Sequence, residues 1–415
     1  MFKRIPIFLF FLIGVFLYLP AQSGQIQALN FDVPPLLAPV TAQPPEIRSV
    51  AAVLADAETG AVLYAKNPHE EISPASLSKL MTMHLVLKEA AAGRISLDDI
   101  VPIGTESWAQ SQPPRSSLMF LAPGQIVTLR EILLGLAVSS GNDAAVAAAL
   151  KVAPSVRDFA AMMTMEARRM GLYQTRFVEP SGISEYNMTT AAEFTAFCRE
   201  YIRLYPNSMA EFHSVPEFAY PTADNVAPAF RDNPRTIVQA NRNALLNTLS
   251  GVDGLKTGYI DEAGYNIALT AQRAETRFIA VILGAPAQPG GDQIRDADGS
   301  RLLSWAFDNF KTVRPVVGRI EPVRLWKGRA NAVEFVTDGP VHFTSPVGRS
   351  HALSYSAVIN EPLVAPLPVN FPAGYLVFYD EDGEVNRVPL LTARAYEQGN
   401  IFKRFLHSIR LLFLR

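Results

Sequence analysis

A serine and a lysine, Ser76 and Lys79, stand three positions apart in the stretch SPASLSK. Ser73 is a good N-cap and Pro74 suits the first helical position, so a helix beginning there would place both side chains on one face. A lysine can remove the serine proton and create a nucleophile if burial lowers the lysine pKa, and the apolar run LMTMHLVL would supply that burial. The spacing alone is also compatible with an ordinary helix cap.

A second polar motif, SSGNDAA, lies where an apolar helical run from Ile132 ends. Gly141 permits a tight turn there, which would point the side chains of Ser140 and Asn142 in the same direction. A hydroxyl in that place can relay a proton, and an amide can hold a substrate carbonyl. Taken alone, the motif could equally be a loop cap.

The third motif is Lys256-Thr257-Gly258, at the head of a predicted strand in GVDGLKTGYIDEAGYNIAL. Lysine supplies a positive charge and threonine a hydroxyl donor, while glycine removes a side chain so that a substrate backbone can approach. An ordinary hairpin strand with an incidental lysine would look the same in isolation. The order of the three motifs in one chain is what makes them specific together.

In that order the motifs resemble the signature elements of penicillin-binding proteins and serine β-lactamases. Over about residues 45 to 310 the chain resembles the low-molecular-weight, DacA-like D-alanyl-D-alanine carboxypeptidases, in the segments LADAETGAVLYAKN, PASLSKLMT, SSGNDAA, TRFVEPSG and NRNALLNTLSGVDGLKTGYIDEAGYNIALTA. The resemblance implies removal of the terminal D-alanine from peptidoglycan stem pentapeptides, a role in wall maturation and cell shape, and covalent inhibition by β-lactams. It implies no cofactor and no metal.

The resemblance also implies a role for each reacting group. Ser76 would be the acylated nucleophile, Lys79 its general base, and Ser140 would pass a proton toward the leaving D-alanine. The backbone N–H groups of Ser76 and Tyr259 would form the oxyanion hole, where donors stabilise charge that develops only in the transition state.

The remaining motif residues would bind substrate. The resemblance implies that Asn142 orients the peptide and that Lys256 and Thr257 hold the terminal carboxylate, beside the space left by Gly258.

Three alternatives stay open. A serine β-lactamase would need a group that activates water, and Glu179 or Glu185 could serve. An endopeptidase acting on wall cross-links would use the same chemistry, although such relatives tend to lack the β domain and anchor predicted below. A non-enzymatic wall-binding scaffold is the third, and the intact reactive residues argue against it.

The elements that must position these residues form an α+β pattern. Two strands are predicted at 51–55 and 61–65, on either side of a DAETG turn. Helices are predicted from Pro74 to about 203, including one at 128–140 and one that ends on Gly171. Strands follow between 251 and 285, and a last helix is predicted at 295–310. Strands distant in sequence would share one antiparallel sheet beside a helical subdomain, as in the β-lactamase/transpeptidase-like fold. A small all-β domain and a C-terminal amphipathic helix would follow.

The domain organisation follows from changes in composition. Residues 1–24 read as an export signal, 25–45 as a proline-rich linker, 46–313 as the catalytic domain, 314–393 as a small β-rich domain and 394–415 as an amphipathic helix. That helix combines an apolar face with basic residues, a pattern typical of an interfacial anchor, so we expect residues 400–415 to bind the membrane surface. The protein would be exported and held peripherally at the outer, periplasmic face of the cytoplasmic membrane.

Charge and cysteine content exclude other classes. The chain has 37 basic and 39 acidic residues, a balance that gives no general attraction to nucleic acid. Its single cysteine, Cys198, cannot form an internal disulfide and lies in a helical pattern, so a buried structural thiol is expected. The six histidines show no metal-binding spacing.

Overall fold

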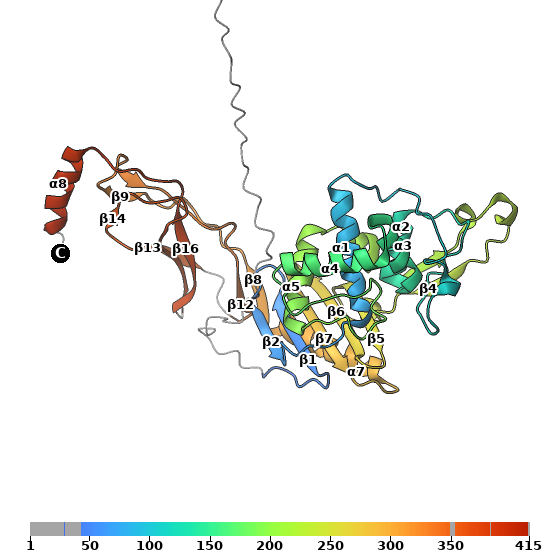
Figure 1. Cartoon of the computed structure of the whole chain (residues 1–415). Helices are drawn as coiled ribbons and strands as arrows, with labels where there is room; N and C mark the ends of the chain where they lie inside the picture. The colour runs from blue at the N-terminus through green and yellow to red at the C-terminus, as the bar shows by residue number, and fades with distance from the viewer. Residues whose placement is uncertain (1–28, 30–42, 349–352, 382, 414–415) are drawn as a thin grey trace, which may run out of the picture.

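The protein is described by a computed structural model that covers residues 29, 43–348, 353–381 and 383–413 (Figure 1). The predicted export signal and most of the predicted linker lie outside the described residues. Within them, a mixed helix-and-sheet part is followed by a part built of strands and by a C-terminal helix. The predicted α+β fold class is therefore confirmed.

A five-stranded antiparallel sheet forms the centre of the first part, with strand order β2-β1-β7-β6-β5. The strands are β1 (Ala51–Asp56), β2 (Val62–Lys66), β5 (Val252–Ile260), β6 (Gly264–Arg273) and β7 (Thr276–Ala285). β1 pairs with β7 along its whole length, so segments more than two hundred residues apart share the sheet, as predicted. β5, which carries the third motif, is an edge strand.

Both faces of this sheet are covered. Because side chains alternate along a strand, Val281 of β7 faces one hydrophobic core and the neighbouring Ile282 faces another. The first core lies under the helical subdomain, and the second lies under α7 (Gly291–Asn309). α7 begins four residues before the predicted Arg295, because its first turn is polar and shows no apolar spacing.

The helix that carries Lys79 begins later than predicted. Ala75 has a left-handed backbone, with φ +50°, so Pro74 cannot start a regular helix. A short 3₁₀ turn, η1 (Ala75–Leu77), holds Ser76, and α1 (Ser78–Ala91) follows it. α1 is buried over most of its length, in the first hydrophobic core.

Around α1 pack the other helices of the subdomain. The predicted helix over 128–140 divides into α2 (Leu129–Leu134), which has a capping box formed by Thr128 and Glu131, and a π-helical turn, η3 (Gly135–Ser139). The helix α4 (Val156–Arg169) is followed by Gly171 with φ +84°, as the sequence predicted. Cys198 is fully buried on α5 (Ala191–Leu204). The remaining elements of this part are α3 (Asn142–Val152), α6 (Leu245–Thr248), the short turns η2 (Ala109–Ser111), η4 (Met209–His213), η5 (Ala223–Asn225) and η6 (Pro228–Phe230), and the hairpin β3 (Glu217–Tyr220) and β4 (Ile237–Ala240).

The second part consists of short strands arranged in small sheets. One sheet has the order β10-β9-β14 and another the order β11-β16-β15-β13, each with its own hydrophobic cluster. Their bounds are β9 (Val323–Trp326), β10 (Ala332–Val333), β11 (Phe335–Val336), β13 (Ser354–Ile359), β14 (Leu363–Val364), β15 (Pro372–Asp380) and β16 (Gly383–Thr392).

A strand pair joins the two parts. β8 (Phe310–Val313), which follows α7, pairs with β12 (Phe343–Pro346), which belongs to the β-rich segment. The hydroxyls of Thr312 and Thr344 both donate to the Asp56 carboxylate, over 2.8 and 2.9 Å. The junction is thus tied to the end of β1, a strand of the central sheet.

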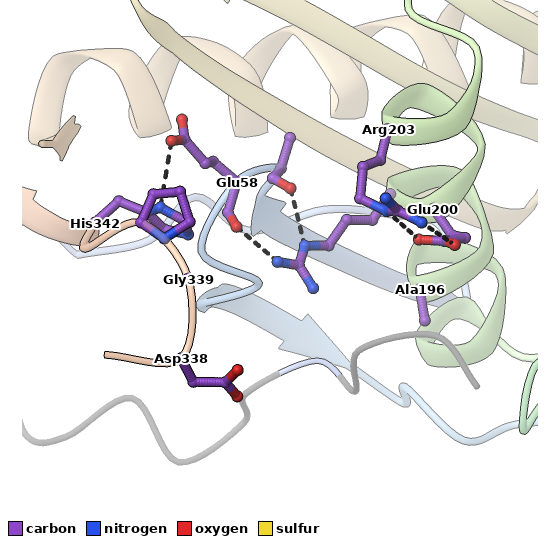
Figure 2. Close-up of a pocket in the computed structure, with 10 residues that line it drawn as sticks. Glu58, Ala196, Glu200, Arg203, Asp338, Gly339 and His342 are labelled. Carbon is purple, nitrogen blue, oxygen red and sulfur yellow. Dashed lines mark hydrogen bonds and ion pairs between the residues drawn. The ribbon is translucent and has the colours of Figure 1, made fainter. Parts of the chain in front are cut away.

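A polar pocket of about 440 Å³ lies beside this junction (Figure 2). Glu58 faces His342 across it, with 3.4 Å between the carboxylate and Nδ1, and Glu58 also pairs with Arg314. The Arg199 guanidinium donates to the carbonyls of Ala57 and Glu58. Arg203 and Glu200 form a further ion pair in the lining, and the pocket is bordered by residues of both parts, so it belongs to the joint between them.

The last helix, α8 (Ile401–Leu412), contacts the β-rich part through its polar side. His407 is buried, and its Nδ1 accepts a hydrogen bond of 2.8 Å from the Lys327 backbone N–H. Lys403 donates to the Asn331 side chain over 3.0 Å. The large apolar side chains of the helix and its end are exposed, namely Ile401, Phe402, Phe405, Leu406, Ile409, Leu412 and Phe413. Among the described residues, helices long and apolar enough to cross a membrane are absent.

Candidate active site

Lys79 lies fully buried beneath Ser76, at the start of α1. Its Nζ contacts three oxygens: Ser76 Oγ at 2.9 Å, Asn142 Oδ1 at 2.8 Å and the Ser181 carbonyl at 2.5 Å. Burial lowers the pKa of Lys79 to about 7, against the opposing effect of the carboxylates of Glu179 and Asp143. A large fraction of the amine is therefore neutral near pH 7.

The three contacts suit a neutral amine. A neutral amine has two N–H groups and one lone pair. Asn142 Oδ1 and the Ser181 carbonyl can only accept, so they occupy the two N–H groups. The lone pair is left for Ser76 Oγ, the one partner that can donate a proton. This arrangement can deprotonate the Ser76 hydroxyl.

The second motif forms the turn between η3 and α3. Ser140 has a left-handed backbone, with φ +59°, a conformation that costs a non-glycine residue on the order of 1–3 kcal/mol. A Cβ on Gly141 would lie 2.7 Å from the Asp143 carboxylate and 2.8 Å from the Met119 backbone N, so only glycine fits. The Ser140 hydroxyl has no hydrogen-bond partner within the described residues. The side chain is buried and leaves its hydrogen-bonding capacity unused.

Asn142 connects the turn to a loop that the sequence did not identify. While its Oδ1 contacts Lys79, its Nδ2 donates to Ser116 Oγ over 3.1 Å. The buried Asp143 fixes the same loop by accepting the backbone N–H groups of Met119 and Leu121. Only contacts between distant parts of the chain place Ser116 here, and the polar stretch around it carries no periodic signal.

The third motif lies on the edge strand β5, next to η1. A Cβ on Gly258 would approach the Pro74 carbonyl to 2.8 Å and the Ser76 backbone N to 3.0 Å, so glycine permits the strand and the turn to touch. Lys256 is buried and donates to the Thr257 carbonyl over 3.0 Å. Burial lowers the pKa of Lys256 well below its usual value.

Further cations surround Lys256. The positive charges of Lys79, Arg242 and Arg295 lower its pKa further, and Arg242 also lowers the pKa of Lys79. Sequence reasoning missed Arg242 and Arg295, because neither belongs to a motif. Arg242 and Arg295 stay charged because a guanidinium is not deprotonated in proteins, so they create a positive field at this end of β5, suited to an anion such as a carboxylate.

Glu179 clamps the loop that supplies the Ser181 carbonyl. Its carboxylate accepts the backbone N–H groups of Ser181 and Gly182, each at 2.7 Å, and the Asn187 amide at 2.8 Å. Its oxygens are thus occupied, which argues against a role in activating water. Glu185, the other residue considered for that role, is exposed on the same loop. A Cβ on Gly182, which has φ +81°, would lie 1.8 Å from the Ala75 carbonyl.

The elements that carry the three motifs border one open cleft of about 460 Å³. Of the predicted site residues, Ser76, Asn142 and Tyr259 line it, and Lys79 lies beneath Ser76. The lining does not include Ser140, Lys256, Thr257 or Gly258. The full lining is Ser76, Pro114, Arg115, Ser116, Ser117, Asn142, Gly182, Ile183, Tyr259, Ile260, Asp261 and Glu262.

Two family models match the chain. One, described as D-alanyl-D-alanine carboxypeptidase, matches residues 38–287, and the other, described as penicillin-binding protein 5, C-terminal domain, matches residues 311–398. The first covers the central sheet and the three motifs, and the second covers the β-rich part.

Known proteins are similar over most of the chain. The D-alanyl-D-alanine carboxypeptidase DacD of Escherichia coli is 34% identical over 373 residues, which are 88% of this chain and 91% of the relative. The crystal structure of penicillin-binding protein 5 from Haemophilus influenzae superposes with a TM-score of 0.76 at 29% identity, over 86% of this chain and all of that one. Penicillin-binding protein 6B from Escherichia coli gives a TM-score of 0.68 at 32% identity, over 85% and 98% of the two chains. The chain therefore belongs to the D-alanyl-D-alanine carboxypeptidase family.

Proposed function

We propose that this D-alanyl-D-alanine carboxypeptidase removes the last D-alanine of a peptidoglycan stem pentapeptide through an ester on Ser76. Lys79 takes the hydroxyl proton as Ser76 Oγ attacks the carbonyl carbon between the two D-alanines. The C–N bond then breaks, and the terminal D-alanine leaves after its nitrogen receives a proton by way of Ser140. Water hydrolyses the ester and regenerates the free hydroxyl.

The contacts of the Lys79 amine carry this proposal. A buried lysine with a pKa of about 7, whose two acceptor contacts leave its lone pair for the Ser76 hydroxyl, suits a general base and has no evident structural purpose. An ordinary helix cap would place the lysine in solvent.

Substrate binding is assigned to the second and third motifs. Lys256 and Thr257 hold the terminal carboxylate, whose negative charge raises the pKa of Lys256 and so restores the ammonium. Asn142 orients the peptide. The backbone N–H groups of Ser76 and Tyr259 stabilise the oxyanion, where loss of one such donor typically costs about 3–4 kcal/mol.

The same site accounts for inhibition by penicillins. A β-lactam would acylate Ser76, and the resulting ester would be long-lived, because the hydrogen bonds to the Glu179 carboxylate leave it unsuited to activating water. This favours a penicillin-inhibited carboxypeptidase over a β-lactamase.

We also place the protein at the outer face of the cytoplasmic membrane, attached through α8. The apolar side chains of that helix are exposed, and its polar side is already engaged with the β-rich part. Basic residues on the helix suit anionic lipid headgroups.

The test uses purified protein comprising residues 25–415. Incubation with a fluorescent penicillin and mass spectrometry of the labelled peptide should locate a stable adduct on Ser76, while the unlabelled protein should release D-alanine from a stem pentapeptide. Rapid loss of the label, with hydrolysed drug in solution, would instead indicate a β-lactamase. Absence of both adduct and D-alanine would reject the proposal.

A further inference from the structure

The outer end of the active-site cleft is bordered by side chains of opposite charge. Arg115 lies on one border, in the loop that Asn142 and Asp143 hold in place. Asp261 and Glu262 lie on the other, at the turn between β5 and β6. Both borders line the same cleft as Tyr259. The hydrogen bond to Asp261 raises the pKa of Tyr259 to about 12, and the charge of Arg115 across the cleft opposes that rise.

Two of these charges have no partner. Asp261 accepts a hydrogen bond of 2.6 Å from the Tyr259 hydroxyl. Arg115 and Glu262 are exposed, and within the described parts of the chain neither forms a hydrogen bond or an ion pair. The apolar Ile183 lies in the same lining and is also exposed. The cleft thus offers a cation, an anion and an apolar contact that the protein itself does not use.

The direction of the substrate brings one part of it to this place. The proposed function puts the terminal carboxylate at Lys256 and Thr257 and the scissile carbonyl at the Tyr259 N–H, and the inference rests on that assignment. These points lie about two residues apart along β5, or about 7 Å. A peptide extended along the strand continues past Tyr259, so the residue preceding the two D-alanines would reach Asp261 and Glu262.

We infer that the outer cleft selects a third stem residue whose side chain ends in both an ammonium and a carboxylate, as in a 2,6-diamino dicarboxylic acid. Glu262 binds the ammonium, Arg115 binds the carboxylate, and Ile183 contacts the methylene chain. A lysine in this position would meet Glu262 but would find no carboxylate partner for Arg115, whose charge would repel it. Arg115 and Glu262 together therefore distinguish a diamino dicarboxylic acid from lysine at the third position, which Glu262 alone would not do.

The experiment compares two pentapeptides that differ only in the third residue, meso-diaminopimelate or L-lysine. D-alanine release is measured as kcat/KM for each peptide. This value is divided by the rate of acylation with benzylpenicillin, which has no third residue, so that any effect of a substitution on the reactivity of Ser76 cancels. The wild-type protein should prefer the diaminopimelate peptide about fivefold, an effect in the range of one exposed ion pair. Arg115→Gln should abolish that preference, and Glu262→Gln should slow both peptides.

Glu185→Gln is the matched control, since Glu185 is an exposed carboxylate on the loop of Ile183 but is not itself among the residues that line the cleft. It should leave the preference unchanged. Equal rates with both peptides in the wild type, or a preference that persists in Arg115→Gln, would overturn the inference alone. Failure of both peptides and of penicillin would overturn the proposed function and the inference with it.

Discussion

Two helices of this protein, α1 and α8, depart from the usual arrangement of a water-soluble domain in opposite ways. α1 carries a lysine, Lys79, into the hydrophobic core, where it is fully buried. α8 carries six large apolar side chains on its surface, including Phe402, which is 83% exposed, while its histidine, His407, is buried. In one helix a charge is hidden from water, and in the other an apolar face is left in it.

The buried lysine of α1 and the exposed apolar face of α8 both lower the stability of the fold in water, and the proposed functions of the two helices explain why they are present. Burial penalises the Lys79 ammonium, and the lowered pKa makes the amine a base. Exposure of the α8 face is unfavourable in water and becomes favourable at a membrane surface. Such local exceptions to good packing are where function is expected.

Removal of the buried amine should give the largest effect. Lys79→Ala should reduce acylation by penicillin about 10⁴-fold, the upper range for loss of a general base, whereas Ser140→Ala should reduce it about 10²-fold. Stopped-flow fluorescence with a labelled penicillin measures both rates, and thermal melting checks that the variants fold. Equal losses in the two variants would contradict the division of roles between the lysine and the serine.

A charge on the apolar face of α8 should have the next largest effect. Phe402→Glu should weaken binding to vesicles containing phosphatidylglycerol about 30-fold, because burial of one phenylalanine side chain contributes about 2 kcal/mol. Cosedimentation measures the binding. Val316→Glu changes an equally exposed apolar residue, 93% exposed, that lies away from the helix, and should bind like the wild type. Similar losses in both variants would reject the anchoring surface.

The pKa of Lys79 predicts a smaller, graded effect of pH. The amine accepts a proton only when neutral, and its pKa is lowered to about 7, so it is protonated and inactive below that pH. The rate constant of penicillin acylation should therefore fall about tenfold per pH unit below 7 and level off above it. Rates measured from pH 5.5 to 8.5 test this, and a flat profile down to pH 5.5 would show that another group is the base.

The smallest effect concerns the buried histidine of α8. His407→Ala removes the acceptor of the Lys327 N–H and the edge-on contact with Trp326, whose ring centre is 5.3 Å away. Amides of α8 should then exchange with deuterium about fivefold faster, since one hydrogen bond contributes about 1 kcal/mol. Ser408→Ala, on the same helix, should change exchange little. Unaltered exchange in His407→Ala would mean that Lys403 alone fixes the helix.

Local patterns were sufficient to predict most of the fold. The alternating strands near residues 51 and 62, and the α4 helix that ends before Gly171, are encoded by neighbouring residues, and the structure places them within about a residue of the predictions. The start of α1 was wrong by several residues. The left-handed backbone at Ala75 is imposed by packing against distant segments, and no local propensity announces it for an alanine.

The site was predictable only where its residues belong to motifs. Ser76, Lys79 and Asn142 were found from their motifs, and the structure brings Ser76 and Asn142 into contact with the Lys79 amine. The Ser181 carbonyl, 102 residues from Lys79, contributes through its backbone, which the residue type does not reveal. Ser116 likewise reaches the site through a loop without periodicity. Contacts of this kind depend on the completed fold.

The glycines that close the cleft also limit how this enzyme can change over evolutionary time. Gly141, Gly182 and Gly258 each stand where an added Cβ would meet backbone atoms at less than 3 Å, so the floor of the site tolerates no single substitution there. Arg115 and Glu262, on its rim, face solvent and are free to vary. Substrate preference can therefore diverge among descendants of this protein by single mutations, while the catalytic centre remains invariant.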